Sequence, residues 1–372
     1  MIREILIVAG ETSGDEHASG LVREINQLDP NLSFFGIGGE RLAEEGVSVV
    51  EHIDTMAIMG FTEVVSRYSH LRRVYNRLLR EVEIRKPARA ILVDYPGFNL
   101  KLAQALRKLG VPIIYFISPQ LWAWREKRVE IIRECVDQMI CIFPFEEAWY
   151  NERGVNANFI GHPFMDREPP TCSRGEFAAR HGIEKDETIV CLMPGSRQQE
   201  VARHMPAMVQ AVGKIREHRP DVKAIIAKSE LVTIVSPLAE GIMVEDEEPI
   251  LSLVHADVAV VASGTATVEA ALYGIPSVVI YRLSPLSWMI ARKVAKTPFI
   301  AMPNLIAGRE VLPELLQGDA TAERISYQMR ELLDSAENRQ AMKEGLKEVR
   351  QKMGRPGALG RGARLIVDRM EA

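Results

Sequence analysis

Residues 5–15 are Ile5-Leu6-Ile7-Val8-Ala9-Gly10-Glu11-Thr12-Ser13-Gly14-Asp15, and they indicate the fold class most directly. Its first five residues form a continuous apolar run, which is typical of a strand buried on both faces of a sheet. An amphipathic segment over residues 18–28 follows and predicts a helix. A strand, a glycine turn and a helix in this order form the first βα unit of a doubly wound domain, in which ligands bind at the carboxyl edge of the sheet.

The turn after this strand differs from a dinucleotide-binding loop. It has two glycines but lacks the G-x-G-x-x-G pattern, which argues against a nicotinamide dehydrogenase. Glu11 and Asp15 stand where a pyrophosphate needs bare backbone amides. Because carboxylates repel phosphate and accept hydrogen bonds from hydroxyl groups, the turn favours a hydroxylated substrate.

Length and charge narrow the class of protein. A chain of 372 residues is too long for one ordinary core, so we expect two domains. A net charge of −4 gives no overall attraction to nucleic acid. The charge is uneven, since residues 1–60 hold 3 basic and 11 acidic groups whereas residues 61–133 hold 15 basic and 6 acidic groups. The second of these regions is suited to an anionic surface.

Cysteine usage and apolar runs predict a cytosolic protein. The four cysteines include no C-x-x-C pair and are expected to be buried reduced thiols: Cys135, Cys141, Cys172 and Cys191. The acidic Glu4 and the short first apolar run do not match a secretory signal, which argues against an exported two-lobed solute-binding protein. No apolar run approaches the ~20 residues that span a bilayer.

Short apolar runs alternate with helical patterns along the chain. The strands predicted in the first half cover residues 4–9, 33–38, 89–93, 112–117, 138–143 and 158–161. Those in the second half cover residues 188–193, 222–227, 241–244, 258–262 and 277–281. This alternation predicts two α/β domains with parallel sheets. We place them at residues 1–168 and 169–345, with a helical tail over residues 346–372 that crosses back to the first domain or to a partner subunit.

Two loops of the second domain are suited to an anion. In the first loop, Gly195 lets backbone amides approach a ligand, while Ser196 and Arg197 add a hydroxyl and a guanidinium that forks onto phosphate. The alternative for this loop is a simple βα turn with a surface arginine.

The second loop, Ser263-Gly264-Thr265, opens a helix, and small residues there leave the N-terminal amides open to a diphosphate. Glu269 lies one turn into that helix, where it is able to accept both hydroxyls of a ribose. The alternative is that Ser263 or Thr265 caps the helix and Glu269 is a favourable acid near its start.

The first domain offers a candidate general base. Asp94 ends the strand at residues 89–93, and an acid at the carboxyl end of a parallel strand faces the ligand crevice. A capping role for Asp94 is the alternative. Trp122 and Trp124 follow a further strand end, and they serve either as core packing or as a platform for a sugar or an acyl chain.

The segment 61–86 predicts a basic amphipathic helix. Apolar residues recur at steps of three or four at Val64, Tyr68, Leu71, Tyr75, Leu78 and Val82. Arginines and a lysine surround them, which is typical of a helix lying on anionic lipid. Alternatively, the stripe packs on the first sheet. We expect the start of this region to reach lipid or acyl chains, through Met59, Phe61, Val64 and Val65.

Two cores, an anion site in the second and an acid in the first together indicate a nucleotide-sugar glycosyltransferase with two Rossmann-like domains. No Asp-x-Asp pair and no His/Cys cluster is placed to hold a metal, so we expect neither a metal nor a cofactor. Arg197 and the helix N-terminus would then neutralise the leaving diphosphate.

The chain resembles the lipid-A-disaccharide synthase family over nearly its full length. The matching segments are Val8-Ala9-Gly10-Glu11-Thr12-Ser13-Gly14-Asp15, Met59-Gly60, Val93-Asp94-Tyr95-Pro96-Gly97-Phe98-Asn99, Ser118-Pro119, Trp122-Ala123-Trp124-Arg125, Pro144-Phe145-Glu146, Ile160-Gly161-His162, Pro194-Gly195-Ser196-Arg197, Ala262-Ser263-Gly264-Thr265-Ala266 and Pro303-Asn304-Leu305-Ile306-Ala307-Gly308-Arg309-Glu310. Each segment alone is weak evidence for the family, but their order and spacing together are specific to it.

The resemblance implies the GT-B fold and an inverting hexosyl transfer. UDP-2,3-diacylglucosamine would donate its sugar to the 6-hydroxyl of 2,3-diacylglucosamine 1-phosphate, giving the β-1,6-linked lipid A disaccharide 1-phosphate and UDP. The catalytic site would comprise Asp94, Glu11, Ser13 and Asp15, and Asn304 would join the UDP site. The family acts in lipopolysaccharide synthesis at the cytoplasmic face of the inner membrane, as homodimers joined through the tail.

Two related enzyme classes share this architecture, the UDP-sugar 2-epimerases and the peptidoglycan glycosyltransferases. They should lack segments like those at residues 10–15 and 303–310. The presence of both segments favours the synthase family.

Overall fold

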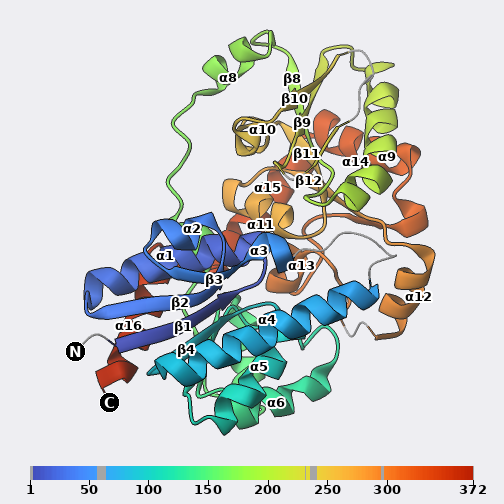
Figure 1. Cartoon of the computed structure of the whole chain (residues 1–372). Helices are drawn as coiled ribbons and strands as arrows, with labels where there is room; N and C mark the ends of the chain where they lie inside the picture. The colour runs from blue at the N-terminus through green and yellow to red at the C-terminus, as the bar shows by residue number, and fades with distance from the viewer. Residues whose placement is uncertain (1–2, 57–63, 231, 235–240, 295–296, 372) are drawn as a thin grey trace. The chain divides into compact units, whose positions relative to one another are not determined.

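The computed structural model describes residues 3–56, 64–230, 232–234, 241–294 and 297–371 (Figure 1). The backbone divides into two compact units. Unit 1 combines Met1–Asp166 with Met353–Ala372, and unit 2 is Arg167–Lys352.

Within the described residues, unit 1 is built on a seven-stranded sheet whose neighbouring strands all run parallel, in the order β3-β2-β1-β4-β5-β6-β7. Residues 5–9 of β1 are completely buried, because a central strand of a doubly wound sheet is covered on both faces. The strands are β1 (Arg3–Ala9), β2 (Leu32–Gly38), β3 (Ser48–His52), β4 (Arg89–Val93), β5 (Ile113–Phe116), β6 (Gln138–Cys141) and β7 (Ala157–Phe159).

Helices cover both faces of this sheet, as Figure 1 shows. On one face, α4 to α6 pack on side chains such as Leu6 and Leu92, and on the other face α1 and α16 pack on Ile5 and Ile91. The helices of unit 1 are α1 (Thr12–Leu28), α2 (Glu40–Glu44), α3 (Ile53–Met56), α4 (Val64–Arg85), α5 (Pro96–Lys108), α6 (Val129–Cys135), α7 (Pro144–Asn151) and α16 (Ala358–Glu371).

The C-terminal helix α16 belongs to unit 1, because Met353–Ala372 group with Met1–Asp166. Both Asp166 carboxylate oxygens accept backbone amides at the start of α16, with the Ala358 and Leu359 amides at 3.0 and 2.9 Å. At the other end, Arg3 donates to the Met370 carbonyl at 2.7 Å. Along the helix, a Cβ on Gly20 of α1 would lie 2.7 Å from Cδ1 of Leu359, so the glycine lets the Leu359 side chain pack closely on α1.

The described part of unit 2 contains a second parallel sheet, of six strands in the order β10-β9-β8-β11-β12-β13. Its strands are β8 (Thr188–Met193), β9 (Val222–Ala227), β10 (Ile242–Glu245), β11 (Val258–Ala262), β12 (Ser277–Tyr281) and β13 (Glu314–Leu316). Its helices are α8 (Arg174–Arg180), α9 (Gln198–Arg216), α10 (Pro249–Val254), α11 (Thr265–Tyr273), α12 (Pro285–Val294), α13 (Met302–Ala307), α14 (Ala322–Asp334) and α15 (Ala336–Lys352). Two parallel sheets with crossover helices confirm the predicted fold class.

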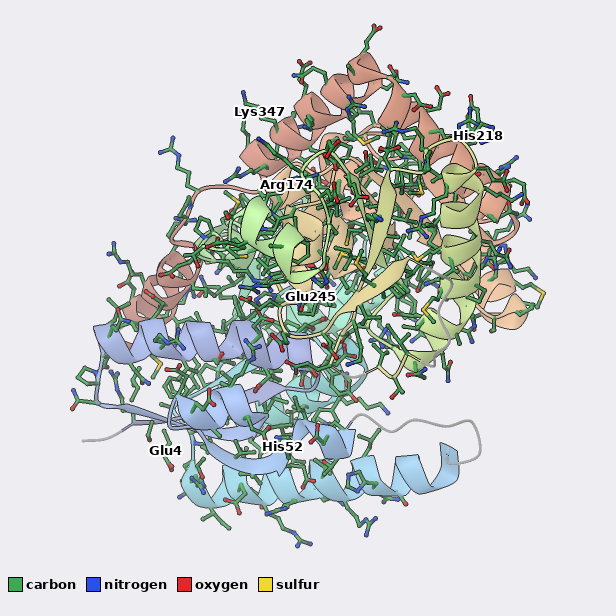
Figure 2. All side chains as sticks on the ribbon, turned by 90° about the horizontal axis from the view of Figure 1, so that it is seen from above. Glu4, His52, Arg174, His218, Glu245 and Lys347 are labelled. Carbon is green, nitrogen blue, oxygen red and sulfur yellow. The ribbon has the colours of Figure 1, made fainter. Side chains whose placement is uncertain are left out.

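Helix α4 corrects part of the membrane expectation. Val74, Leu78 and Val82 are buried, and Leu71 and Tyr75 pack against the same core. The described apolar stripe therefore lies on the sheet instead of facing lipid. Arg85 of this helix donates to Glu4 at 3.1 Å (Glu4 is labelled in Figure 2). Met59 and Phe61 lie outside the described residues, and Val64 and Val65 form the first turn of α4.

The cysteines match the sequence-based expectation for most positions. All four are free thiols; Cys135, Cys141 and Cys191 are buried, whereas Cys172 is half-buried.

Candidate functional site

Each sheet has one point at which the strand order reverses, and the predicted site loops lie at these two points. In unit 1, β1 is flanked by β2 and β4, so the loops after β1 and β4 meet at the carboxyl edge. They carry Glu11 and Asp94. In unit 2, β8 is flanked by β9 and β11, and the loops after β8 and β11 carry Arg197 and Gly264. Ligands of open α/β sheets bind at such switch points.

Asp94 lies in a strained turn at the end of β4. Asp94 and Tyr95 both have left-handed backbones, with φ of 41° and 46°. For residues other than glycine this costs on the order of 1–3 kcal/mol each. The turn is held because Asn99 donates from Nδ2 to the Asp94 carbonyl at 2.9 Å, and the Tyr115 hydroxyl donates to the same carbonyl at 2.5 Å. Strain maintained in this way is typical of functional positions.

The environment of Asp94 suits a base that works near neutrality. Burial raises the pKa of Asp94 to about 7, and the negative charge of Glu11 adds to the increase. A carboxylate of this strength accepts a proton from a hydroxyl better than an ordinary, more acidic carboxyl group does.

The other acids of the first loop have different positions. Glu11 and Ser13 are exposed at the start of α1. Asp15 is 2% exposed, and its two oxygens accept the backbone amides of Gly39 at 2.6 Å and Arg41 at 3.2 Å. Asp15 therefore fastens the loop after β2 to the start of α1, a positional role that its sequence pattern does not reveal.

Glu146 is a buried acid that sequence reasoning did not select, although it belongs to a family segment. It is completely buried on α7 and accepts the Trp122 indole N–H at 3.1 Å and the Phe143 amide at 3.2 Å. Burial raises the pKa of Glu146 to about 7, and the charge of Asp94 contributes. Glu146 thus anchors the loop after β5 through Trp122, which packs as core, whereas Trp124 is 42% exposed.

The loop after β8 is locked by a histidine. Gly195 has φ of 126°, which favours glycine. The fully buried His204 of α9 bonds the Pro194 carbonyl through Nδ1 at 2.7 Å and accepts the Arg282 amide at Nε2 at 2.9 Å. Because an amide can only donate, Nε2 must be unprotonated and Nδ1 must carry the proton. Burial accordingly lowers the pKa of His204.

Arg197 supplies the positive charge of this loop. Its side chain is 69% exposed and lies 3.6 Å from a Glu200 oxygen, a long ion pair that a stronger anion can displace. Its position at the N-terminus of α9 adds the partial positive charge of the helix end.

The loop after β11 presents backbone at the N-terminus of α11. Gly264 has φ of 139°, and a Cβ built there meets nothing within 4 Å, so the space beside its Cα is open. Ser263 donates from its hydroxyl to the Ile300 carbonyl at 3.4 Å, which ties this loop to the segment before α13. This arrangement suits a phosphate group.

Glu269 and Asn304 are both committed to protein contacts. Glu269 accepts from Arg167 at 2.8 Å. Asn304 is completely buried, donates to the Leu312 carbonyl at 2.8 Å and accepts the Val311 amide at 2.7 Å. It also bonds Glu314 and the Leu312 amide, at 2.9 Å each. The Asn304 side chain therefore shapes the loop after α13 and has no bonding capacity left for a ligand.

Two further observations concern the described residues as a set. Among them, no group of three or more His, Cys, Asp or Glu side chains is placed to hold a metal ion. No helix in the described ranges is long and apolar enough to cross a membrane.

Solved structures with a similar fold include a UDP-GlcNAc 2-epimerase from Neisseria meningitidis bound to UDP-GlcNAc, with a TM-score of 0.64 and 11% identity over 99% of both chains. MurG of Acinetobacter baumannii has a TM-score of 0.59 and 12% identity, covering 98% of this chain and 99% of its own. At this identity the likeness concerns the fold alone, the architecture shared by GT-B glycosyltransferases and UDP-sugar epimerases.

Sequence similarity separates these classes. A lipid-A-disaccharide synthase of Myxococcus xanthus is 41% identical over 98% of this chain and 97% of its own length. One from Geobacter sulfurreducens is 39% identical, covering 98% and 96%. The family model described as lipid-A-disaccharide synthetase matches residues 5–358. The chain therefore belongs to the lipid-A-disaccharide synthase family.

Proposed function

We propose that this protein joins UDP-2,3-diacylglucosamine to 2,3-diacylglucosamine 1-phosphate, with inversion at the anomeric carbon. The products are the β-1,6-linked lipid A disaccharide 1-phosphate and UDP. The observation that carries the proposal is the family match over nearly the whole chain. A strained acid at one switch point and an anion loop pair at the other are consistent with it.

The UDP portion of the donor is assigned to unit 2. The diphosphate would bind the amides of Gly195, Ser196, Ser263, Gly264 and Thr265 with the Arg197 guanidinium. Glu269 would accept the ribose hydroxyls, either sharing its carboxylate with Arg167 or displacing it. Asn304 would act indirectly, by fixing the loop after α13.

The acceptor hydroxyl is assigned to Asp94. The oxygen of the acceptor hydroxyl attacks the anomeric carbon of the donor sugar as the bond from that carbon to the UDP phosphate oxygen breaks. The hydroxyl proton passes to the Asp94 carboxylate, and the electrons of the broken bond leave with UDP. Glu11 would tune the basicity of Asp94, Ser13 would contribute a hydroxyl from the start of α1, and Asp15 would hold the loop in place.

The partners and location follow from the acylated substrates. We assign the protein to the cytoplasmic face of the inner membrane, as a peripheral protein. The basic region that includes α4 and the segment with Met59 and Phe61 would meet the anionic surface. Two copies of the chain would form a homodimer through the C-terminal tail.

The test is incubation of the purified chain with both acylated substrates, scoring UDP release and product mass. The expected result is one UDP released for each disaccharide phosphate formed, and Asp94→Asn should be strongly impaired. UDP release without a disaccharide, or epimerisation of UDP-N-acetylglucosamine, would contradict the proposal and favour the epimerase class.

A further inference from the structure

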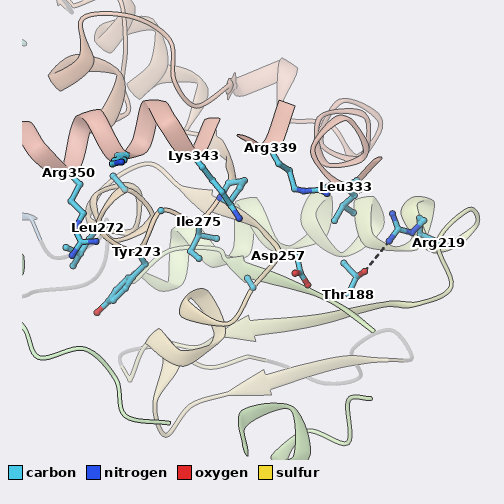
Figure 3. Close-up of a pocket in the computed structure, with 15 residues that line it drawn as sticks. Thr188, Arg219, Asp257, Leu272, Tyr273, Ile275, Leu333, Arg339, Lys343 and Arg350 are labelled. Atoms are coloured by element: carbon cyan, nitrogen blue, oxygen red, sulfur yellow. Dashed lines mark hydrogen bonds between the residues drawn. The ribbon is translucent and has the colours of Figure 1, made fainter. Parts of the chain in front are cut away.

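A cavity of about 530 Å³ lies in unit 2, away from the loops already described (Figure 3). It is lined by Thr188 at the start of β8, by Asp257 just before β11 and by Pro276 just before β12. These are the amino ends of the strands, so the cavity is at the opposite edge of the sheet from Gly195 and Gly264. Its volume is within the range of small-molecule sites.

The described lining residues carry a strong excess of positive charge. Asp257 is the one carboxylate among them, and the five cations are Arg219, Arg339, Lys343, Lys347 and Arg350. The Asp257 carboxylate is already used, since it accepts Arg174 and the Ile189 amide at 2.8 Å each. It therefore does little to neutralise the cavity.

Two of the five cations have structural partners. Arg219 pairs with Asp221 at 2.9 Å and Asp334 at 3.0 Å. Arg339 donates to the carbonyls of Leu332 and Leu333 at the end of α14, at 2.7 Å each. Within the described residues, the other three cations form no hydrogen bond or ion pair: Lys343, Lys347 and Arg350.

These three cations lie along one stripe of α15, at steps of four and three residues, as Figure 3 and the Lys347 label in Figure 2 allow the reader to follow. Like charges at this spacing repel and destabilise a helix. Within the described residues, the acids of α15 form no ion pair with these three cations; Glu344 accepts from Gln340 at 3.1 Å, and Glu348 pairs with Lys352 at 2.8 Å and with Arg309 at 2.7 Å.

The neighbouring end of α11 explains only part of this charge. That helix ends at Gly274, which lines the cavity, and a helix C-terminus carries about half a negative charge. Half a charge does not balance three full positive charges. The three side chains are exposed and solvated, and the stripe keeps a net positive charge that a bound anion would neutralise.

We propose that this cavity binds a phosphate-bearing ligand through Lys343, Lys347 and Arg350, with Leu272, Ile275 and Leu333 forming an apolar floor. Lysine and arginine bind phosphate by charge-assisted hydrogen bonds, and the apolar side chains accommodate the remainder of the ligand. The ligand is either a soluble phosphate compound or the headgroup of an anionic lipid. The site goes beyond the proposed glycosyl transfer, because it uses none of the residues assigned to that reaction.

The experiment compares two triple variants of the full chain. The cavity variant is Lys343→Gln/Lys347→Gln/Arg350→Gln, and the matched control removes three exposed cations elsewhere in unit 2, Lys185→Gln/Lys214→Gln/Arg324→Gln. Inorganic pyrophosphate is titrated calorimetrically into each at constant ionic strength, and each is floated with vesicles containing phosphatidylglycerol in phosphatidylcholine. Any binding at the other edge of the sheet is common to both variants, so their difference reports the cavity.

The expected result is pyrophosphate binding at least about tenfold weaker in the cavity variant than in the control, because three charge-assisted contacts are lost. A vesicle defect in the cavity variant, added to this loss, identifies a lipid headgroup; normal flotation identifies a soluble phosphate compound. Equal behaviour of the two variants in both assays overturns the proposal. The single variant Lys347→Glu repeats the comparison should the triple variant fail to fold.

Discussion

At the scale of single residues, Asp94 determines the expected pH dependence. Its pKa is about 7 in the fold and 3.8 ordinarily, so the folded state holds the proton more tightly. The stability contributed by protonated Asp94 is therefore complete below pH 3.8 and lost as the pH rises through 7. A base must be ionised, so kcat/KM should rise about tenfold per pH unit up to about pH 7 and then level.

Glu11 gives this prediction a second test. Glu11→Gln removes a negative charge that raises the pKa of Asp94, so the acid limb of the pH profile should move to lower pH. Glu44→Gln is the matched control, an exposed glutamate of unit 1 whose charge is not among the causes of the shift.

Asp94→Asn keeps the shape of the side chain but removes the base, so it should lower kcat by about 10²–10⁴-fold. A folded Asp94→Asn protein with normal kcat would make Asp94 structural.

Arg197 is the residue that distinguishes an anion loop from a plain turn. Arg197→Ala should weaken UDP binding by roughly 1.5–3 kcal/mol, the value of a hydrogen bond to a charged group. Arg203→Ala removes the next arginine along the chain, which lies within α9 and donates to Gln199 at 3.5 Å, and should leave the affinity nearly unchanged. Calorimetric titration of UDP measures both. Equal UDP affinities in the two variants would show that Arg197 does not bind UDP.

The sequence predicted site loops better than it predicted individual roles. Loops at strand ends are visible as apolar runs followed by glycine or acid, and the structure places these at the switch points. The sequence does not reveal which polar side chains form their hydrogen bonds with other groups of the protein instead of with a ligand. Asn304 and Asp15 have polar side chains in family motifs, yet both are buried and bonded to backbone amides. His204 and Glu146 hydrogen-bond to residues far away in the sequence, Arg282 and Trp122, and a local sequence pattern does not predict such contacts.

At the scale of elements, strand prediction succeeded where burial is complete. Strands β4, β8, β9, β11 and β12 have the predicted bounds, because each is an apolar run covered on both faces. Strands β3 and β13 were not predicted. Both lie at an edge of their sheet and pair with one neighbouring strand. Most of their side chains are half-buried, and neither strand carries a long apolar run.

The start of α11 depends on one backbone conformation. Gly264→Ala should destabilise unit 2 and weaken UDP binding, because φ of 139° is strained for any side chain although the space for a methyl group is free. The cost is on the order of 1–3 kcal/mol. Gly213→Ala is the control, since that exposed position inside α9 also has open space but an ordinary φ, and alanine should stabilise it slightly. Urea unfolding measures both; equal effects would contradict the argument.

The attachment of α16 depends on a cap supplied by a distant residue. Asp166→Ala removes the acceptor of amides at the start of α16, so this end should loosen by about 1–2 kcal/mol. Asp368→Ala removes an exposed acid from the same helix and should have little effect. Hydrogen exchange over residues 358–371 is the measurement. Unchanged protection near residue 358 in the Asp166 variant would show that packing on α1 alone holds the helix.

At the scale of the whole molecule, the net charge of −4 conceals a strongly basic region. Residues 61–133 carry 15 basic and 6 acidic groups, and α4 contributes many of the cations. Since the apolar stripe of α4 packs on the core from Leu71 onward, this helix offers a membrane mainly its exposed charges. Among these, Arg77 is paired with Glu51 at 3.2 Å, whereas Arg72, Arg73 and Arg80 form no ion pair within the described residues.

We therefore predict that these charges attract the protein to an anionic bilayer. Each arginine near an anionic surface contributes about 1 kcal/mol, so Arg72→Gln/Arg73→Gln/Arg80→Gln should weaken binding to phosphatidylglycerol vesicles by on the order of 100-fold. Binding of the unaltered chain should fall as salt is added, because screening shortens the reach of each charge to about 8 Å near physiological ionic strength. The control Arg41→Gln/Arg355→Gln/Arg364→Gln removes three exposed arginines of unit 1 that lie outside residues 61–133. If both triple variants float like the unaltered chain at every salt concentration, α4 is not the membrane contact, and the acylated substrates must be reached through another surface.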